Sequence, residues 1–158
     1  MENTFELELR SVPFEHADSV MLRSAQRAEL TARYGTEDSE PGVKPNADSV
    51  VVFLIAYVDG VPAGCGGLRE LDTGVFEIKR MYVAPAQRGT GVSIAVLRGL
   101  EEWARAQSAT DLVLETGTAQ PDAMRFYERE GYSRIDNFGD YVGEPLSVCY
   151  SKALESVD

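Results

Sequence analysis

The sequence predicts an α+β fold, in which several β-strands and helices share one domain. Two patterns predict it: β-prone segments that follow one another through tight turns, and amphipathic helical segments between them. Size agrees, because 158 residues with 44% hydrophobic side chains suit the core of one ordinary domain and leave no room for a second. We therefore expect residues 1–158 to form a single domain.

The first third of the chain predicts a strand, a helix and a loop. Residues 5–12 alternate apolar with acidic or polar side chains, as a half-buried strand does. Apolar residues recur at helical spacing over residues 17–34, and Gly35 ends the pattern. Residues 36–48 are the longest irregular stretch, and loops of that length are usually functional or mobile.

The middle of the chain predicts three strands. Residues 50–58 are strongly β-prone, and Asp59-Gly60 before the apolar run 61–68 is the signal of a hairpin with a tight primed turn. After another turn at residues 72–74, residues 75–83 form the third of these strands.

The second half of the chain predicts two more helices and three strands. Pro121 suits the first turn of a helix, and Gly131 suits the position just past its end. The expected elements are a helix from Val92 to about Gln107, a strand over 111–115, a helix over 121–130, and strands over 132–135 and 146–152. The complete order is β-α-β-β-β-α-β-α-β-β.

A glycine turn separates the third middle strand from the helix that follows it. The turn reads Arg88-Gly89-Thr90-Gly91-Val92-Ser93. Glycines let the backbone approach a ligand closely, and the first helical N–H groups and the positive end of the helix dipole point the same way. Phosphate is the expected ligand, although a plain tight turn is the alternative interpretation. No Gly-Lys-Ser/Thr follows, which excludes a Walker A loop.

This turn resembles the central motif of the GNAT N-acetyltransferase superfamily, Arg/Gln-x-x-Gly-x-Gly/Ala between a strand and a long helix. Arg88, Gly91 and Ser93 occupy its positions, with a small serine in place of Gly/Ala. Residues 77–83 (EIKRMYV) resemble the family's cofactor-binding strand, and residues 126–132 (FYEREGY) resemble its tyrosine-bearing helix and exit. Since the three motifs stand in the family's order, the resemblance implies the GNAT fold, an α/β sandwich in which a mixed central β-sheet is flanked by helices. The predicted element order matches this fold.

The resemblance implies acetyl-CoA as cosubstrate. Its pyrophosphate would bind at residues 88–93, and its pantetheine amides would pair with the strand backbone at Met81, Tyr82 and Val83. The family's strand splays near this point, so we expect a main-chain N–H, that of Met81, to polarise the thioester carbonyl.

Two residues are candidates for acid–base catalysis. Tyr127 matches the family tyrosine that can protonate the leaving thiolate, and its alternative role is that of a core aromatic. Glu77 stands where many GNAT enzymes carry a carboxylate base, which would act through water. Its alternative role is a structural ion pair with Lys79 or Arg80, since residues 77 and 79 of a strand share a face.

Candidate acceptor-binding residues come from the segment after the first helix and from the connection between the last two strands. Acidic and aromatic side chains there suit a small amine through charge pairing and cation–π contact, although solvated loop residues are the alternative. These candidates are Tyr34, Glu37, Asp38, Phe138 and Tyr141. The strings ETG-x-x-QP and FG-x-Y-x(3)-P-x-SV resemble one bacterial GNAT subgroup, which has poorly defined acceptors. Many relatives place an asparagine contact to the cofactor after the fifth strand, where this chain offers Gln120 or Thr116 instead.

Charge and cysteine content restrict the partners. A net charge of −11 disfavours nucleic acid and anionic membranes and suits a cationic or neutral acceptor, although solubility alone also explains it. The start of the chain has no signal-peptide pattern, which favours a cytoplasmic location. Cys65 and Cys149 have no metal-ligand spacing and are expected to be buried free thiols, with no metal site. The only histidine, His16, suits a helix cap or the surface.

Together these observations predict an acetyl-CoA-dependent N-acetyltransferase that transfers acetyl directly to a primary amine of a small molecule. A non-catalytic acyl-CoA-binding sensor or structural module is the main alternative, and a nucleotide-phosphate-binding protein is a third. A homodimer stays open as the assembly.

Overall fold

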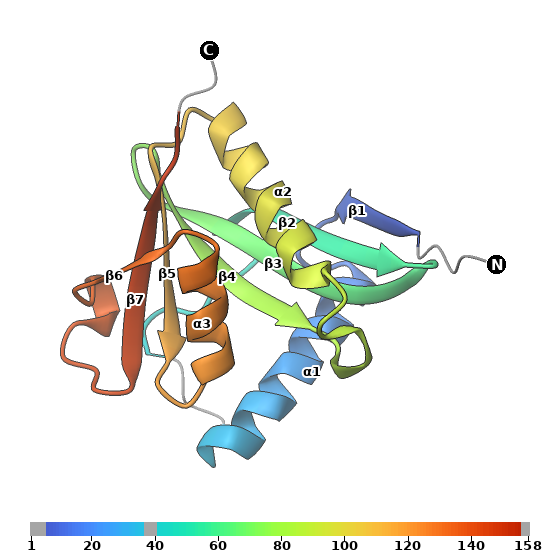
Figure 1. Ribbon diagram of the computed structural model, residues 1–158, viewed down its shortest axis with the longest axis horizontal. Helices are drawn as coiled ribbons and strands as arrows, with labels where there is room; N and C mark the ends of the chain where they lie inside the picture. Colours follow the sequence, from blue (N-terminus) through green and yellow to red (C-terminus); the bar gives the residue numbers. More distant parts are fainter. Residues whose placement is uncertain (1–5, 37–40, 156–158) are drawn as a thin grey trace.

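The computed structural model describes residues 6–36 and 41–155, which form a seven-stranded sheet with helices on both faces (Figure 1). The sheet order is β1-β2-β3-β4-β5-β7-β6, and only β4 and β5 pair in parallel. The elements are β1 (Leu7–Ser11), α1 (Ala17–Tyr34), β2 (Val50–Val58), β3 (Val61–Asp72), β4 (Val75–Val83), α2 (Val92–Ala106), β5 (Asp111–Gly117), α3 (Pro121–Arg129), β6 (Ser133–Ile135) and β7 (Ser147–Ala153). The expected mixed sheet and element order are confirmed.

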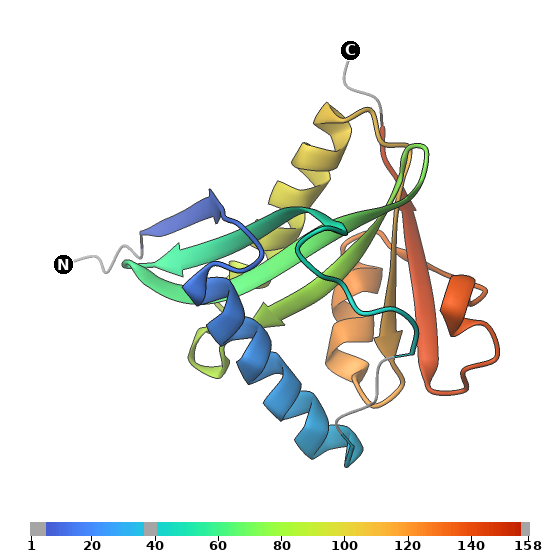
Figure 2. The same ribbon diagram turned by 180° about the vertical axis from the view of Figure 1, so that it is seen from behind.

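Two hydrophobic cores lie on opposite faces of this sheet. The larger packs α2 and α3 against one face, and the smaller packs Leu22 of α1 and Phe14 against the other. Figure 1 shows α2 and α3 in front of the sheet, and Figure 2, seen from behind, shows α1 across the opposite face. In β2 successive residues alternate between the cores: Leu54 belongs to the first and Phe53 to the second.

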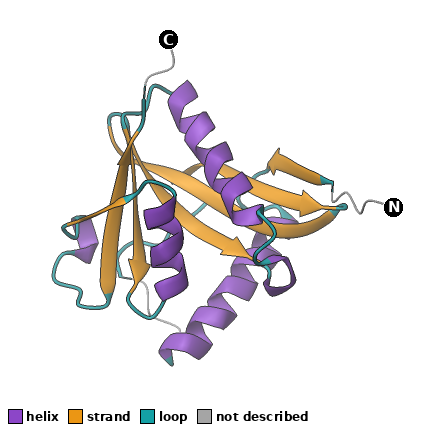
Figure 3. Ribbon diagram, in the orientation of Figure 1, coloured by secondary structure: helices purple, strands orange, loops and turns teal. Residues whose placement is uncertain are grey.

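Some element ends and burial patterns differ from the expectations. All five residues of β1 are exposed, so the expected half-buried strand is wrong: β1 is an edge strand that pairs only with β2. Short 3₁₀ helices at Pro85–Gln87 and Gly139–Tyr141 were not expected and stand beside the loops that Figure 3 colours teal. His16 caps α1 by accepting from the N–H of Asp18 at 3.1 Å, in agreement with its expected capping role.

The pairing of β4 with β5 ends halfway along both strands. It runs from Val75↔Asp111 to Ile78↔Leu114, after which both strands continue without pairing to each other. Just beyond that point the β3–β4 register shifts, and Arg80 has a left-handed φ of 62°. The two strands therefore separate at the centre of the sheet, as the splayed strand of the resemblance implies.

Glycines of β3 let α2 lie close to the sheet beside this opening. A Cβ on Gly64 would lie 2.6 Å from Val92 Cγ1, and one on Gly66 would lie 3.0 Å from Val96 Cγ1. Larger side chains would move the helix away. The close approach places the N-terminus of α2 next to the end of β4.

Two further observations concern the cysteines and the length of the helices. Cys65 and Cys149 are free and buried, as expected. Among residues 6–36 and 41–155, no helix has the length and apolar character that a membrane crossing requires.

Candidate active site

A cleft opens where β4 and β5 separate. It contains an inner cavity of about 100 Å³ and an outer cavity of about 480 Å³. Both are lined by side chains from α1, β4 and α3, and the residues common to both are Gln26, Leu30, Met81, Gln120, Ala123 and Tyr127. A long, narrow ligand could therefore pass from the outer cavity into the gap between the strands.

The end of β4 presents backbone groups to this cleft. The N–H of Ala84 donates to the carbonyl of Ala63 at 2.8 Å, so by alternation the N–H and carbonyl of Val83 point away from β3. The Val83 carbonyl accepts from Arg88 Nε at 3.1 Å, and the Met81 carbonyl accepts from Gln26 Nε2 at 2.8 Å. Since β5 does not pair here, this edge of β4 can hydrogen-bond an extended ligand as a further strand would.

The N-terminus of α2 has the features of an anion site. Gly91 is its N-cap with φ 91°, and Gly89 has φ 79°, both in the left-handed region that favours glycine. No side chain caps the helix, and its first turn contains no acidic residue. The first helical N–H groups thus keep the orientation that suits a phosphate. Val92 is buried in the core, so it can offer a ligand only its backbone.

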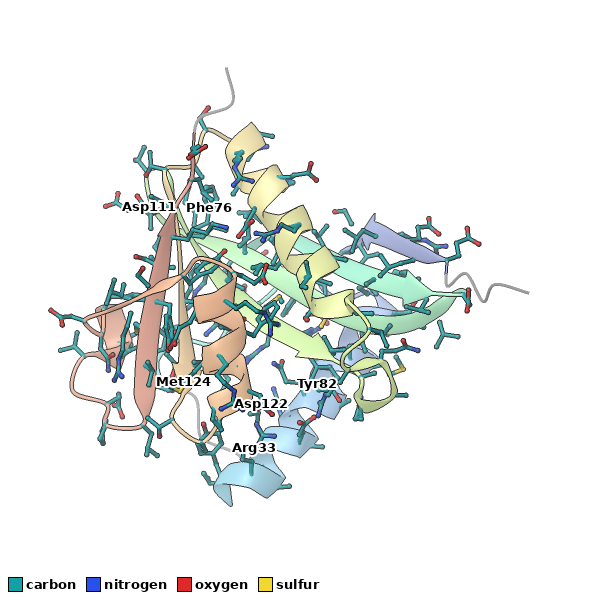
Figure 4. The ribbon with its side chains drawn as sticks, viewed as in Figure 1. Arg33, Phe76, Tyr82, Asp111, Asp122 and Met124 are labelled. Atoms are coloured by element: carbon teal, nitrogen blue, oxygen red, sulfur yellow. The ribbon has the colours of Figure 1, made fainter. Side chains whose placement is uncertain are left out.

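Arginines surround the outer cavity. Arg88 pairs with Glu29 of α1 at 2.6 Å, and this hydrogen bond raises the pKa of the guanidinium. Figure 4 shows Arg33 of α1, Tyr82 of β4 and Asp122 of α3 coming to the same opening, and all three line the outer cavity. The further arginines of the lining are Arg125 and Arg129.

Tyr127 of α3 lines both cavities, and only 6% of it is exposed. Burial raises the pKa of its phenol, which keeps the hydroxyl protonated. Within the described part of the chain this hydroxyl has no hydrogen-bond partner. The ring packs edge-on against Phe126 and Tyr132, so Tyr127 is a core aromatic as well as a cleft residue.

Glu77 of β4 lies outside the inner and outer cavities of the cleft. Its carboxylate is 0% exposed and lines neither of these cavities. Arg69, directly opposite on β3, donates from Nε to Oε1 at 2.7 Å, and the Tyr141 hydroxyl donates to Oε2 at 2.6 Å. Lys79 Nζ is 3.8 Å from Oε2. This geometry favours the ion-pair alternative over the base, with Arg69 as an additional partner that the sequence alone did not identify.

The predicted acceptor residues do not all come together. Tyr34 lines a third cavity of about 280 Å³, and its hydroxyl accepts from Gln120 Nε2 at 3.5 Å. Tyr141 is buried beside Glu77, Phe138 packs edge-on against it at 5.2 Å, and neither lines the third cavity. Glu37 and Asp38 lie outside the described residues.

One carboxylate was missed by the sequence predictions. Glu115 of β5 lines the inner cavity together with Tyr127, and it also lines the third cavity. Ser147 of β7 donates to its Oε2 at 2.7 Å. The sequence did contain a signal for this residue, because Glu115 is the first polar residue after the apolar run Leu112–Leu114 of the predicted strand. What the sequence could not supply was the separation of β4 from β5 beside it.

Comparisons with known proteins show the family to which the chain belongs. The model of the Acetyltransferase (GNAT) family matches residues 19–132. The IAA acetyltransferase of Azospirillum brasilense is 36% identical over 103 residues, which are 65% of this chain and 67% of that protein. A crystal structure from Klebsiella pneumoniae, described as an acyl-CoA N-acyltransferase, is 30% identical, with a TM-score of 0.79 over 94% of this chain and 98% of that one.

A GNAT acetyltransferase from Elizabethkingia anophelis, solved with acetyl-CoA bound, is 16% identical, with a TM-score of 0.70 over 94% of this chain and 98% of that one. At 16% identity, this similarity shows that the two chains share a fold. The family match itself covers well over half of the chain. This protein therefore belongs to the GNAT acetyltransferase family: it is an N-acetyltransferase, and acetyl-CoA is its acyl donor.

Proposed function

We propose that the enzyme transfers acetyl from acetyl-CoA directly to a primary amine of a small molecule, with no covalent enzyme intermediate. The observation that carries this proposal is the inner cavity, which Tyr127 and Glu115 line together with Met81. A proton donor and a proton acceptor thus border one small space beside the open edge of β4. Acyl transfer to an amine requires both groups.

In this proposal the pyrophosphate of acetyl-CoA binds at the turn of residues 88–93, and the pantetheine extends along Met81, Tyr82 and Val83. The uncapped α2 N-terminus and the arginines of the outer cavity support the first contact. The backbone of Val83, directed away from β3, supports the second. A main-chain N–H, that of Met81, polarises the thioester carbonyl.

Glu115 is the carboxylate that takes a proton from the bound ammonium, directly or through one water, so that the amine can attack the thioester carbon. The C–N bond forms, the C–S bond breaks, and the phenol of Tyr127 gives its proton to the departing thiolate. A phenol whose pKa is raised by burial stays protonated until the thiolate forms. Glu77 keeps a positioning role, because Lys79 beside it lines the inner cavity.

Release of the CoA thiol, measured with a thiol reagent over a panel of amines, tests this function. Tyr127→Phe should keep acetyl-CoA affinity and lower kcat by about 10²-fold. Tyr150→Phe is the matched control, since Tyr150 is a buried tyrosine that lines none of the three cavities. Saturable binding of acetyl-CoA without thiol release on any amine would instead support an acyl-CoA-binding module.

The pyrophosphate site has its own test. Gly91→Val should weaken acetyl-CoA binding by about tenfold or more, because valine is strained at φ 91° and the turn must rearrange. Gly60→Val is the control for backbone strain, since Gly60 has φ 81°, also faces open space, and lies in the β2–β3 turn. Equal affinities in a folded Gly91→Val variant would show that the anion binds elsewhere.

Three further expectations stand beside this proposal. The two buried free thiols support a cytoplasmic location. The ETG-x-x-QP and FG-x-Y-x(3)-P-x-SV strings support membership of the bacterial subgroup. A homodimer stays open as the assembly, and light scattering of the purified protein measures the oligomeric state.

A further inference from the structure

The third cavity adjoins the inner cavity. The two share three lining residues: Leu30 of α1, Glu115 of β5 and Gln120. A molecule in the third cavity can therefore place one end beside Glu115 and Tyr127. The outer cavity has the volume and the arginines that suit acetyl-CoA. The third cavity is therefore the side from which an acceptor can reach Glu115.

The two ends of the cleft differ in charge. Four arginines line the outer cavity, with Glu29 and Asp122 beside them. Among the described residues that line the third cavity, two are acidic, Glu115 and Glu144, and none is lysine, arginine or histidine. The end with arginines suits a phosphate-bearing donor, and the acidic end suits a cation.

The rest of the third cavity is largely apolar. Leu30, Pro41, Pro145 and Leu146 contribute hydrocarbon walls. Tyr34 closes one side, where its hydroxyl lies against the Cα hydrogens of Gly117, so that any larger residue there would displace it. The volume of about 280 Å³ is just below the roughly 300–1,000 Å³ that is usual for ligand sites, which suits a small acceptor.

We infer that the acceptor is a small primary amine with an apolar alkyl or aryl body and no carboxylate. The inference rests on the proposed amine acetylation and adds the class of amine. The ammonium group lies beside Glu115, and the apolar body lies against Leu30, Pro145 and Leu146. On the side of the third cavity, the carboxylate of an amino acid would face Glu144 or Glu115, and no described residue that lines this cavity is cationic, which disfavours binding. Lys79, which pairs with Glu77, and Arg80 line the inner cavity instead.

Matched acceptors test this directly with the full-length enzyme. We expect kcat/KM for phenethylamine and tryptamine to exceed that for phenylalanine and tryptophan by at least about tenfold. Basicity alone predicts the opposite order, because the simple amines hold their protons more tightly. Phenylalaninamide, which replaces the carboxylate by a neutral amide of similar size, should regain most of the difference, and this separates charge from bulk.

A charge reversal in the cavity sharpens the test. Glu144→Lys should reduce the preference for phenethylamine over phenylalanine by about fivefold or more, chiefly through KM. Glu102→Lys makes the same change of net charge on the exposed surface of α2 and should leave the preference unchanged.

Amino acids acetylated as well as or better than their decarboxylated partners would overturn this inference, while thiol release on them would still support amine acetylation. Equal shifts in the two lysine variants would also overturn it, because net charge would then explain the preference. Failure of every amine and amino acid to release CoA from bound acetyl-CoA would contradict the proposed function itself.

Discussion

Glu77 and Glu101 are two buried carboxylates with the same kinds of partner in different parts of the molecule. Both are 0% exposed, and each contacts one arginine, one lysine and one tyrosine hydroxyl. The partners are Arg69, Lys79 and Tyr141 for Glu77, and Arg98, Lys152 and Tyr132 for Glu101. Local chemistry alone does not distinguish them.

Their positions do. Glu101 lies on α2, and its partners connect that helix to β7 and, through Arg98 at 2.6 Å, to Glu130 at the end of α3. Neither Glu101 nor any of these partners lines the three cavities. Glu77 lies on β4, and its neighbour Lys79 lines the inner cavity. A buried, paired carboxylate is therefore no evidence of catalysis by itself, and its place relative to the cleft decides.

The largest expected effect is on stability. Glu101→Gln and Glu77→Gln should each lower the free energy of unfolding by about 3 kcal/mol, because each removes a buried carboxylate that an arginine, a lysine and a tyrosine hydroxyl contact together. For a chain of this length that is a fall in Tm of about 6–12 °C. Calorimetry measures it, and Glu102→Gln on the surface of α2 is the control.

The Glu101→Gln and Glu77→Gln variants should also differ in catalytic activity. Below its Tm, Glu101→Gln should keep the wild-type kcat/KM, whereas Glu77→Gln should lower it several-fold through Lys79. A loss of activity in folded Glu101→Gln equal to that of Glu77→Gln would remove the distinction between the two clusters.

A further prediction compares the roles of Glu77 and Glu115 in catalysis. Glu115→Gln should lower kcat by about 10²-fold and remove the acidic limb of the pH profile of kcat/KM, because it removes the proposed proton acceptor. Glu77→Gln should retain that limb, since its carboxylate does not line the cleft. If the limb instead disappears with Glu77, that residue is the base after all and Glu115 only shapes the cavity.

The smallest effect concerns stability at low pH. Burial raises the pKa of Glu101, but hydrogen bonds from Arg98, Tyr132 and Lys152 outweigh it, so the pKa is below its ordinary 4.5. The stabilisation is then complete above about pH 4.5 and declines as pH falls through the lower folded value. Chemical denaturation from pH 7 to pH 3 should show wild type approaching Glu101→Gln in stability. A constant difference across this range would contradict the shifted pKa.

Local signals explain which parts of the fold were predictable. The hairpin at Asp59-Gly60, the α2 turn at Gly91 and the end of α1 at Gly35 each depend on residues adjacent in sequence, and the structure has them in place. The exposure of β1 was not predictable, because alternation records which face is apolar and not whether another layer covers that face.

The sequence by itself determined the order of helices and strands, the glycine turn that opens α2, and the resemblance that pointed to acetyl-CoA. Tertiary structure alone decided where each carboxylate lies relative to the cleft. Strand register placed Arg69 opposite Glu77, where the two side chains pair, while the separation of β4 from β5 gave Glu115 and Tyr127 a common cavity. Helices, turns and caps arise from neighbours along the chain, but a site between strands depends on contacts between residues far apart in sequence, which no local pattern records.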